Sequence, residues 1–299
     1  MRKSVSAIVL IAVGFMIGTA AGVFLSPVRD ALYEFKNKAR ITLGLPKHWA
    51  AVASPDVTSR QTIPCPAPGE ALVLVTGGQS NAANSNSALS ATEPGEGVLT
   101  WYDGACYATT DPVLGATSAG GSLWPEFGRA LAAGTARPIL FVHGAVGGTQ
   151  VEDWLDPRSG YLAALRRRVE GLRAAGFEPD WILWHQGETD ANIIEDRETF
   201  RVALTDLTGR LLELAPEASL YMFRASRCIG PKRQAGVAMI REVQTEVAEA
   251  NPRIELGMDT DELGPDFRRD GCHFNSLGRK AVIAKAAPDL LRLEAARAR

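Results

Sequence analysis

Apolar runs and longer segments of helical period alternate along the chain from residue 71 onward. Short runs rich in Val, Leu, Ile and Phe predict buried strands, and they lie at residues 71–76, 138–143, 180–185, 219–224 and 254–258. Segments with apolar residues three or four apart predict amphipathic helices, and they lie at 124–133, 161–175, 197–214, 232–250 and 276–297. The alternation predicts an α/β fold, with a parallel sheet covered by helices on both faces.

The first part of the chain has a different pattern. No charged residue occurs between Ser4 and Val28, directly after Arg2 and Lys3. A run of about 20 apolar residues spans a bilayer, and basic flanking residues stay on the cytoplasmic side. We therefore predict a transmembrane signal anchor over residues 1–28, with a cleaved signal peptide as the alternative. Both readings place the rest of the chain outside the cytoplasm, on the periplasmic side of the cell envelope, membrane-anchored or secreted.

Residues 29–70 are expected to form a juxtamembrane linker. Residues 29–43 fit a short amphipathic helix, and residues 46–69 contain five prolines, which favours an extended segment. Residues 71–299 then form the functional domain. Within that domain, residues 84–112 are rich in Ser, Asn and Gly, and we expect a lid or a wall of a ligand site there.

Composition changes this picture in two ways. The chain has 299 residues, of which 46% are hydrophobic and 22% charged, and this suits a globular protein with one sizeable core. The net charge is only −2, and no basic stripe is interleaved with aromatic residues, so nucleic acid is not expected as a partner. No feature of the sequence indicates an oligomeric state.

Four cysteines follow the predicted anchor. An even number in an extracytoplasmic chain predicts disulfides, with four buried free thiols as the alternative. Of the three possible pairings we predict Cys65–Cys106 and Cys228–Cys272, because each pair would tie together two loops near the same edge of the sheet.

Candidate chemistry begins after the first predicted strand, at Gly77-Gly78-Gln79-Ser80-Asn81. A serine beside glycines on a tight turn after a buried strand presents its hydroxyl at the edge of the sheet. Because ligands bind at the carboxyl ends of parallel strands, Ser80 is the candidate nucleophile. Ala82 stands where the Gly-x-Ser-x-Gly elbow of α/β-hydrolases has its last glycine, which argues against that class.

A candidate base lies just before the last predicted helix. In Asp270-Gly271-Cys272-His273, the carboxylate of Asp270 can reach the imidazole of His273 from the same turn. The aspartate would then fix the tautomer of His273, and the other ring nitrogen would activate Ser80 as general base.

Acyl transfer also needs donors for the developing oxyanion. Two further strands are followed by segments of the right kind, Gly144-Ala145-Val146-Gly147-Gly148-Thr149 and Trp184-His185-Gln186-Gly187-Glu188-Thr189-Asp190. A glycine N–H from the first, the Gln186 amide from the second and the Ser80 N–H are the candidate donors.

These four segments resemble the signature blocks of SGNH (GDSL-like) hydrolases, in the branch of sialate O-acetylesterase-like and plant acetylxylan-type carbohydrate esterases. Gly78-Gln79-Ser80-Asn81 resembles the nucleophile block and Gly147-Gly148-Thr149 the oxyanion glycine block. His185-Gln186-Gly187-Glu188-x-Asp190 resembles the third block, and Asp270-x-x-His273 resembles the last. The match covers residues 72–285, and four motifs in order are far more specific than one.

The resemblance implies a three-layer α/β/α sandwich with a central parallel sheet of about five strands. It implies a catalytic triad formed by Ser80, Asp270 and His273. It also implies an oxyanion hole formed by Ser80, Gly148 and Gln186. Supporting roles fall to Gln79, Asn81, His185 and Glu188. The block lacks the Gly-Asp-Ser-Leu form of the wider family, so lipase-like substrates are not expected.

Some of these residues also fit other roles. His143, His185 and His273 could bind zinc, but the Asp270 turn accounts better for His273, and we expect no metal and no cofactor. Glu188 and Asp190 are either supporting acids or alternative partners of His273. Arg224 and Arg227, after the fourth strand, could bind an anionic sugar.

The sequence therefore predicts a serine esterase that removes acetyl groups from a carbohydrate in the cell envelope. One alternative is an O-acetyltransferase with the same triad, in which a sugar hydroxyl replaces water. Another is a non-catalytic carbohydrate-binding protein on a degenerate hydrolase fold.

Overall fold

The computed structural model describes residues 57–194, 196–228 and 234–297. Contacts divide the chain into Met1–Trp49 and Ala50–Arg299, and every described residue belongs to the second unit. The predicted signal anchor and the predicted helix at 29–43 lie outside the described residues. In the described part of the chain, none of the helices has the length and apolar character needed to cross a bilayer.

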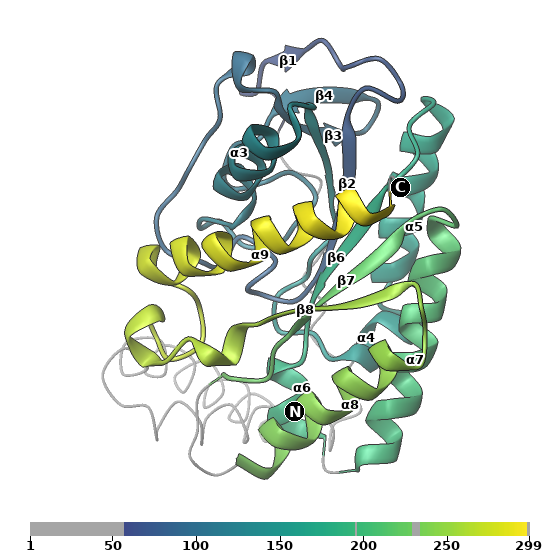
Figure 1. Ribbon diagram of the computed structural model, residues 1–299, viewed down its shortest axis with the longest axis vertical. Coiled ribbons are helices and arrows are strands. Elements are labelled where there is room, and N and C mark those ends of the chain that lie inside the picture. The colour runs from purple at the N-terminus through teal and green to yellow at the C-terminus, as the bar shows by residue number, and fades with distance from the viewer. Residues whose placement is uncertain (1–56, 195, 229–233, 298–299) are drawn as a thin grey trace, which may run out of the picture. The chain divides into compact units, whose positions relative to one another are not determined.

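An eight-stranded mixed sheet forms the centre of the fold (Figure 1), in the order β1-β4-β3-β5-β2-β6-β7-β8. The five predicted strands are all present, as β2 (Leu72–Gly78), β5 (Ile139–His143), β6 (Trp181–His185), β7 (Ser219–Arg224) and β8 (Ile254–Asp259). They pair in parallel, with β2 between β5 and β6. Strands β2, β5 and β6 are buried along their whole length, which explains their unbroken apolar sequences.

Three strands that the sequence did not predict extend this sheet. Strand β3 (Val98–Tyr102) pairs in parallel with β5, β4 (Ala105–Ala108) folds back antiparallel on β3, and β1 (Thr62–Ile63) pairs antiparallel with β4. The prediction of a parallel sheet of about five strands is therefore wrong in two respects. The sheet has eight strands, and two of its pairings are antiparallel. Asp103 and Gly104 both have positive φ, 49° and 84°, and an Asp-Gly turn of this kind is a strong hairpin signal. The segment 84–112, expected as a lid or a wall of a ligand site, thus contains the β3–β4 hairpin.

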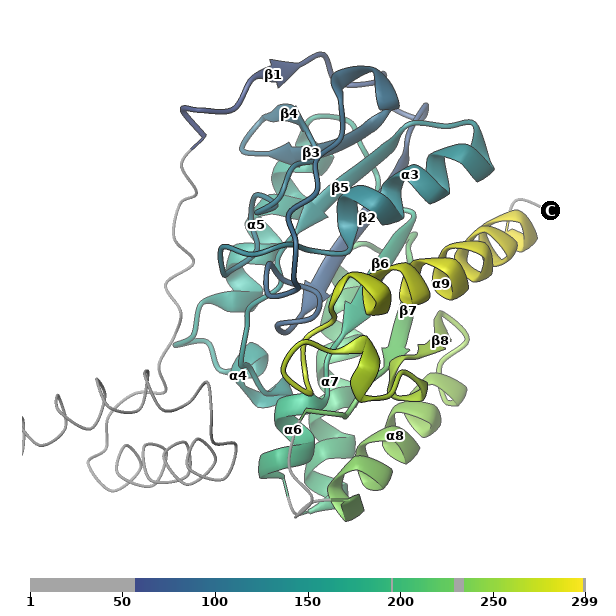
Figure 2. The same cartoon turned by 90° about the vertical axis from the view of Figure 1, so that its left-hand side faces the viewer.

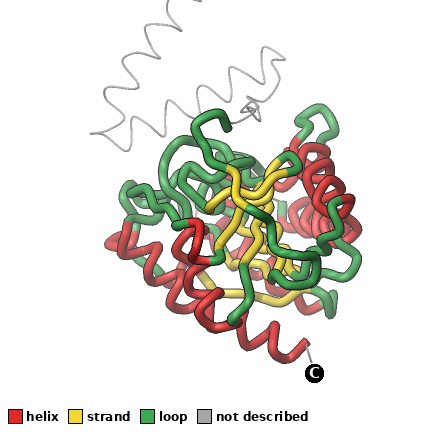
Figure 3. Tube along the Cα trace, turned by 90° about the horizontal axis from the view of Figure 1, so that it is seen from above, coloured by secondary structure: helices red, strands yellow, loops and turns green. Residues whose placement is uncertain are grey.

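Helices cover both faces of the sheet, as expected. Helices α3 (Trp124–Thr135) and α9 (Ser276–Arg297) pack together on one face, whereas α5 (Tyr161–Ala174), α7 (Arg197–Leu214) and α8 (Gln234–Glu249) lie on the other (Figure 2). Seen from above, the strands lie between two groups of helices (Figure 3). These five helices are the ones that the sequence predicted.

Several short elements escaped prediction because they span too few residues to show a period. They are the helices α4 (Val151–Leu155) and α6 (Glu188–Ile193) and the 3₁₀ turns η1 (Pro94–Glu96), η3 (Thr260–Glu262) and η4 (Pro265–Phe267). Helix α4 begins just after the first predicted oxyanion segment and α6 begins within the second, at Glu188, so both helices are continuous with the loops of the candidate site.

A buried apolar cluster joins α3 and α9 to the sheet. It includes Trp124 and Phe127 of α3, Phe141 of β5 and Leu290 of α9, all fully buried. Phe274, the residue after His273, belongs to the same cluster. The core therefore anchors the segment that carries the predicted base.

Both predicted disulfides are present. Cys65–Cys106 joins the segment after β1 to β4, and Cys228–Cys272 joins the loop after β7 to the predicted base loop. The predicted pairing is therefore confirmed.

Candidate active site

The turn that carries Ser80 is defined by the end of β2. Gly78 has φ of +112°, and a Cβ there would lie 2.0 Å from the carbonyl oxygen of His185 on the neighbouring strand. Only glycine relieves both the steric contact and the backbone strain. The chain can then turn sharply, with the Gln79 N–H donating to the same His185 carbonyl at 2.9 Å.

Ser80 and Gln79 sit at the carboxyl edge of the sheet, where the sequence predicted them. The Gln79 side-chain oxygen accepts the Thr189 N–H of α6 at 3.1 Å, so the turn is tied to the third predicted block. Ser80 is 7% exposed. Between these ties the turn has little freedom to move.

Asp270 and His273 form the predicted pair. The Nδ1 of His273 lies 2.7 Å from Asp270 Oδ2, and Asp270 Oδ1 accepts the backbone N–H groups of Cys272 and His273 at 3.0 and 2.8 Å. Burial alone would raise the pKa of Asp270, but these hydrogen bonds and the nearby imidazole outweigh burial and hold the pKa well below its usual range. Asp270 is thus an anion that orients the imidazole of His273.

Asn81 connects the nucleophile turn to the base loop. Its Nδ2 donates to the Cys272 carbonyl at 3.3 Å, and its Oδ1 accepts the Phe274 N–H at 3.2 Å. The same Nδ2 donates to Glu188 Oε1 at 2.8 Å. The side chain after the candidate nucleophile therefore binds the residues on both sides of the candidate base.

The two candidate reacting atoms are the Ser80 hydroxyl oxygen and Nε2 of His273. Within the described part of the chain, neither the Ser80 hydroxyl nor Nε2 of His273 has a hydrogen-bond partner. Hydrogen bonds between nucleophile and base are often long in free enzymes and shorten when substrate binds. The structure thus brings the two segments together, and no other described group competes for the Ser80 hydroxyl or for Nε2 of His273.

A buried arginine that the sequence analysis did not single out holds the base loop. Arg268 donates to the carbonyls of Cys272 and Thr260, and its guanidinium lies 4.9 Å from the ring centre of Phe274. Burial lowers its pKa from the usual value. No sequence motif marks this role, because its partners are backbone carbonyl groups, which every residue carries.

The glycine loop after β5 supplies free backbone donors. Gly148 has φ of +75°, and a Cβ on it would meet no atom within 4 Å, so the backbone conformation and not crowding favours glycine there. Among the described residues, the N–H groups of Ser80 and Gly148 have no acceptor. Both are available for an oxyanion.

Gln186 is held differently from the predicted arrangement. Its Nε2 donates to the Thr149 carbonyl at 2.7 Å and to Asp190 Oδ2 at 3.2 Å, so both amide hydrogens are engaged. Asp190 also accepts the Val151 N–H at 2.8 Å. Burial raises the pKa of Asp190 to about 7, against the opposing effect of these two hydrogen bonds. In this structure Gln186 therefore braces the glycine loop that follows β5.

His185 and Glu188 are buried beneath the site. The Nδ1 of His185 lies 3.4 Å from Glu188 Oε1, and its Nε2 lies 3.2 Å from the Thr260 hydroxyl. Burial lowers the pKa of His185, although Glu188 acts in the opposite direction. Glu188 contacts Asn81 and His185, so in this structure it supports the site from below; the carboxylate that His273 contacts is that of Asp270.

The residues of the alternative readings lie elsewhere. His143 contacts the hydroxyls of Thr76 and Thr100, and burial lowers its pKa to about 3. Arg224 pairs with Asp259 at 2.8 Å. Among the described residues, no group of three or more His, Cys, Asp or Glu side chains could hold a metal ion.

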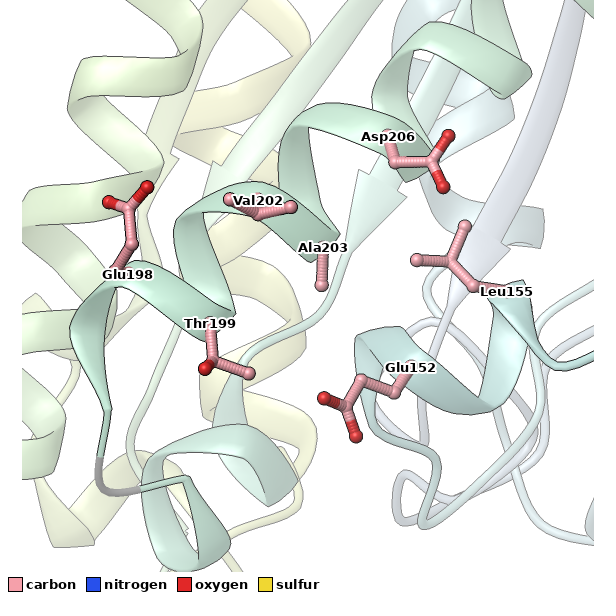
Figure 4. A pocket seen from close by; sticks show the side chains of 7 residues that line it. All are labelled: Glu152, Leu155, Glu198, Thr199, Val202, Ala203 and Asp206. Carbon is pink, nitrogen blue, oxygen red and sulfur yellow. The ribbon is translucent and has the colours of Figure 1, made fainter.

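A shallow groove of about 430 Å³ lies between α4 and α7 (Figure 4). Its walls are formed by Glu152, Leu155, Glu198, Thr199, Val202, Ala203 and Asp206. Glu198 and Asp206 pair with Arg201 and Arg210 of the same helix. None of the predicted site residues lines this groove.

The mixed sheet, with these blocks at its carboxyl edge, defines an SGNH-type hydrolase fold. Residues 72–291 match the family described as carbohydrate esterase, sialic acid-specific acetylesterase. The chain therefore belongs to this family, which confirms the resemblance found in the sequence. A search of the curated proteins found no match.

Solved structures agree on the fold. A protein from Arabidopsis thaliana is 18% identical with a TM-score of 0.60, over 74% of this chain and 97% of the other. A carbohydrate acetylesterase from Xanthomonas citri is 18% identical with a TM-score of 0.50, over 72% of this chain and 54% of the other. A family 3 carbohydrate esterase from Talaromyces cellulolyticus is 13% identical with a TM-score of 0.50, over 74% of this chain and 97% of the other.

Proposed function

We propose that this protein is a serine esterase that removes acetyl groups from the hydroxyls of a carbohydrate through an acetyl-enzyme on Ser80. Membership in a carbohydrate esterase family supports hydrolysis of such esters. The serine mechanism and the role of each residue rest on the geometry of the site.

One observation carries the proposal. The Asn81 side chain is bonded on both sides of His273, to Cys272 and to Phe274. Asn81 and Phe274 are 193 residues apart in the sequence, and this contact joins the segments that carry them. A serine on one segment and an Asp-oriented histidine on the other is the arrangement that nucleophilic catalysis by a hydroxyl requires.

In the acylation step, Ser80 Oγ attacks the acetyl carbonyl while Nε2 of His273 takes the hydroxyl proton. Asp270 holds the Nδ1 proton and stabilises the imidazolium that forms. The N–H groups of Ser80 and Gly148 donate to the oxyanion. When the tetrahedral intermediate collapses, His273 passes the proton to the sugar oxygen and the acetyl group stays on Ser80.

Deacylation repeats the same steps with water. His273 takes a proton from water as its oxygen attacks the acetyl-enzyme, and His273 then returns the proton to Ser80 as acetic acid leaves and ionises to acetate in solution. Each step uses only side chains and backbone groups of this chain, so the proposal includes no cofactor. We further propose that the substrate lies in the cell envelope, on the periplasmic side, because the apolar segment from Ser4 to Val28 would carry the domain there.

Replacing the nucleophile tests the proposal. Ser80→Ala should lower the hydrolysis of p-nitrophenyl acetate by about 10⁴-fold or more, since loss of the attacking group removes the covalent route. The matched control is Ser219→Ala, at the start of β7 and hence at the opposite edge of the sheet, which should keep wild-type activity. Circular dichroism checks that both variants fold. A folded Ser80→Ala variant with wild-type activity would refute the proposal.

A further inference from the structure

A wall of three hydroxyl groups lies beside the nucleophile and plays no part in the mechanism above. A Cβ placed on Gly147 would lie 3.6 Å from Thr117 Oγ1, 3.7 Å from Ser118 Oγ and 3.7 Å from Ser80 Cβ. The hydroxyls of Thr117 and Ser118 therefore border the same small space as the Ser80 side chain. The third hydroxyl, that of Ser85, bonds to Ser118 at 3.1 Å.

Thr117 is fixed from three directions. Its N–H donates to the Ala145 carbonyl at 3.0 Å, its carbonyl accepts the Asn84 N–H at 3.0 Å, and its hydroxyl accepts the Gly147 N–H at 2.8 Å. These bonds join the wall to the nucleophile segment and to the oxyanion loop. Thr117 is thus a structural residue that sets the position of its neighbour, Ser118.

Ser118 has a strained backbone and an exposed side chain. Its φ is +74°, a conformation that serine rarely adopts, while the carbonyl before it and the Gly120 N–H after it are both bonded to Asn84. The surrounding bonds therefore impose the conformation. Such strain is concentrated at functional positions, and its effect here is to present a hydroxyl to solvent beside Ser80.

We propose that Ser118, with Ser85, binds the sugar portion of the substrate and so determines the preference for carbohydrate esters. This inference rests on the proposed esterase function. An acetyl group is small and apolar at its methyl end, so a pair of solvent-facing hydroxyls does not suit it. Sugar hydroxyls both donate and accept hydrogen bonds, as serine hydroxyls do, and a fixed pair of them would orient the ring before attack on its ester.

The test compares an acetyl ester that has no sugar with esters that have one. Ser118→Gly removes the hydroxyl and fits the positive φ without strain. Ser85→Ala removes the second hydroxyl. The kinetic constants kcat and KM are measured with p-nitrophenyl acetate, O-acetylated sialic acid and glucose pentaacetate. Each variant should lower kcat/KM for the preferred sugar ester by about tenfold, mainly through KM, and change p-nitrophenyl acetate hydrolysis by less than about twofold.

Ala88→Gly is the matched control. Ala88 is also exposed and also has positive φ, 59°, so this change relaxes a comparable backbone position without removing a hydroxyl. It should leave both substrates unaffected. The proposal would be overturned if the Ser118 and Ser85 variants lost kcat/KM equally on both classes of substrate, or on neither. It would also be overturned if Ala88→Gly showed the same loss of kcat/KM.

The wild-type enzyme supplies the remaining distinction. Hydrolysis of p-nitrophenyl acetate that depends on Ser80, with no preference for either sugar ester, would refute the role of Ser118 and leave the esterase mechanism intact. Failure of Ser80→Ala to reduce hydrolysis would instead refute the mechanism itself.

Discussion

The two halves of the candidate site are held in place by different kinds of interaction. On the nucleophile side, the end of β2 sets the position of Ser80 through backbone geometry, because Gly78 has φ of +112° and touches the strand beside it. On the base side, His273 lies on a loop outside regular structure, and side chains hold it. Asn81, Arg268 and the Cys228–Cys272 disulfide all contact that loop.

This difference predicts how each half responds to change. A backbone constraint is steric, so a substitution that violates it disrupts the turn as a whole. Several side chains hold the base loop and partly replace one another. The loss of one of them should therefore displace His273 only slightly and lower activity without abolishing it.

Gly78→Ala should abolish activity and lower the free energy of unfolding by about 3 kcal/mol or more, from backbone strain and steric overlap with the His185 carbonyl. Urea unfolding and p-nitrophenyl acetate hydrolysis measure the two effects. Gly209→Ala in α7 is the control, because a Cβ there meets no atom within 4 Å. That variant should gain up to about 1 kcal/mol of stability. A stable and active Gly78→Ala variant would contradict the steric account.

Asn81→Ala should lower kcat/KM for p-nitrophenyl acetate by about a hundredfold, since it breaks the contacts that join the two halves and leaves Glu188 without its donor. The control is Asn251→Ala, whose side chain caps a turn before β8. It should keep normal kinetics. If Asn81→Ala retains full activity, the base loop does not depend on this connection.

The two disulfides offer a direct comparison of stability with activity. They close loops of similar length, 41 and 44 residues apart, so removal of either should cost a similar amount, about 4 kcal/mol in the chain-entropy account. Only Cys228→Ser with Cys272→Ser should also lower kcat, by about tenfold, because only that pair holds the base loop. Kinetics and thermal unfolding of both double variants, at a temperature where both are folded, provide the measurement. If both double variants have the same kcat, the Cys228–Cys272 disulfide does not help to position His273.

Asp190 should affect stability more than chemistry. Its pKa of about 7 in the folded protein exceeds the ordinary value near 4, so the folded state binds the proton more tightly than the unfolded chain. The wild-type free energy of unfolding should therefore fall as pH rises from about 4 to 7, by up to about 1.4 kcal/mol per pH unit. Asp190→Asn should lack this component. Urea unfolding across that pH range checks it, and identical slopes would show that Asp190 titrates normally.

The sequence predicted the parts of the protein that follow local rules. Five strands and five helices are where the patterns place them, because buried parallel strands show as continuous apolar runs and amphipathic helices show a helical period. Both disulfides also have the predicted partners. The β3–β4 hairpin was missed although Asp103-Gly104 signals it. A turn signal of two residues is weak beside the polar composition of the surrounding segment, which is typical of a loop.

The site was predictable only as far as its motifs reach. Local spacing marks Ser80 as a candidate nucleophile and predicts the contact between Asp270 and His273. Arg268 instead binds carbonyl groups that no motif reveals. Gln186 was predicted to donate to the oxyanion, but its donors engage Thr149 and Asp190. Such competition among partners depends on segments that meet only in the folded chain.

The bond between Asn81 and Phe274 spans 193 residues, and this has a consequence for biosynthesis. Closing so long a loop carries a large entropic cost that is recovered only once both ends have their partners. Phe274 precedes α9, and its ring packs in the cluster to which α9 contributes. A nascent chain that still lacks its last helix would hold a finished nucleophile turn with no base beside it. The enzyme should therefore acquire activity only after α9 has been synthesised and has packed on the sheet.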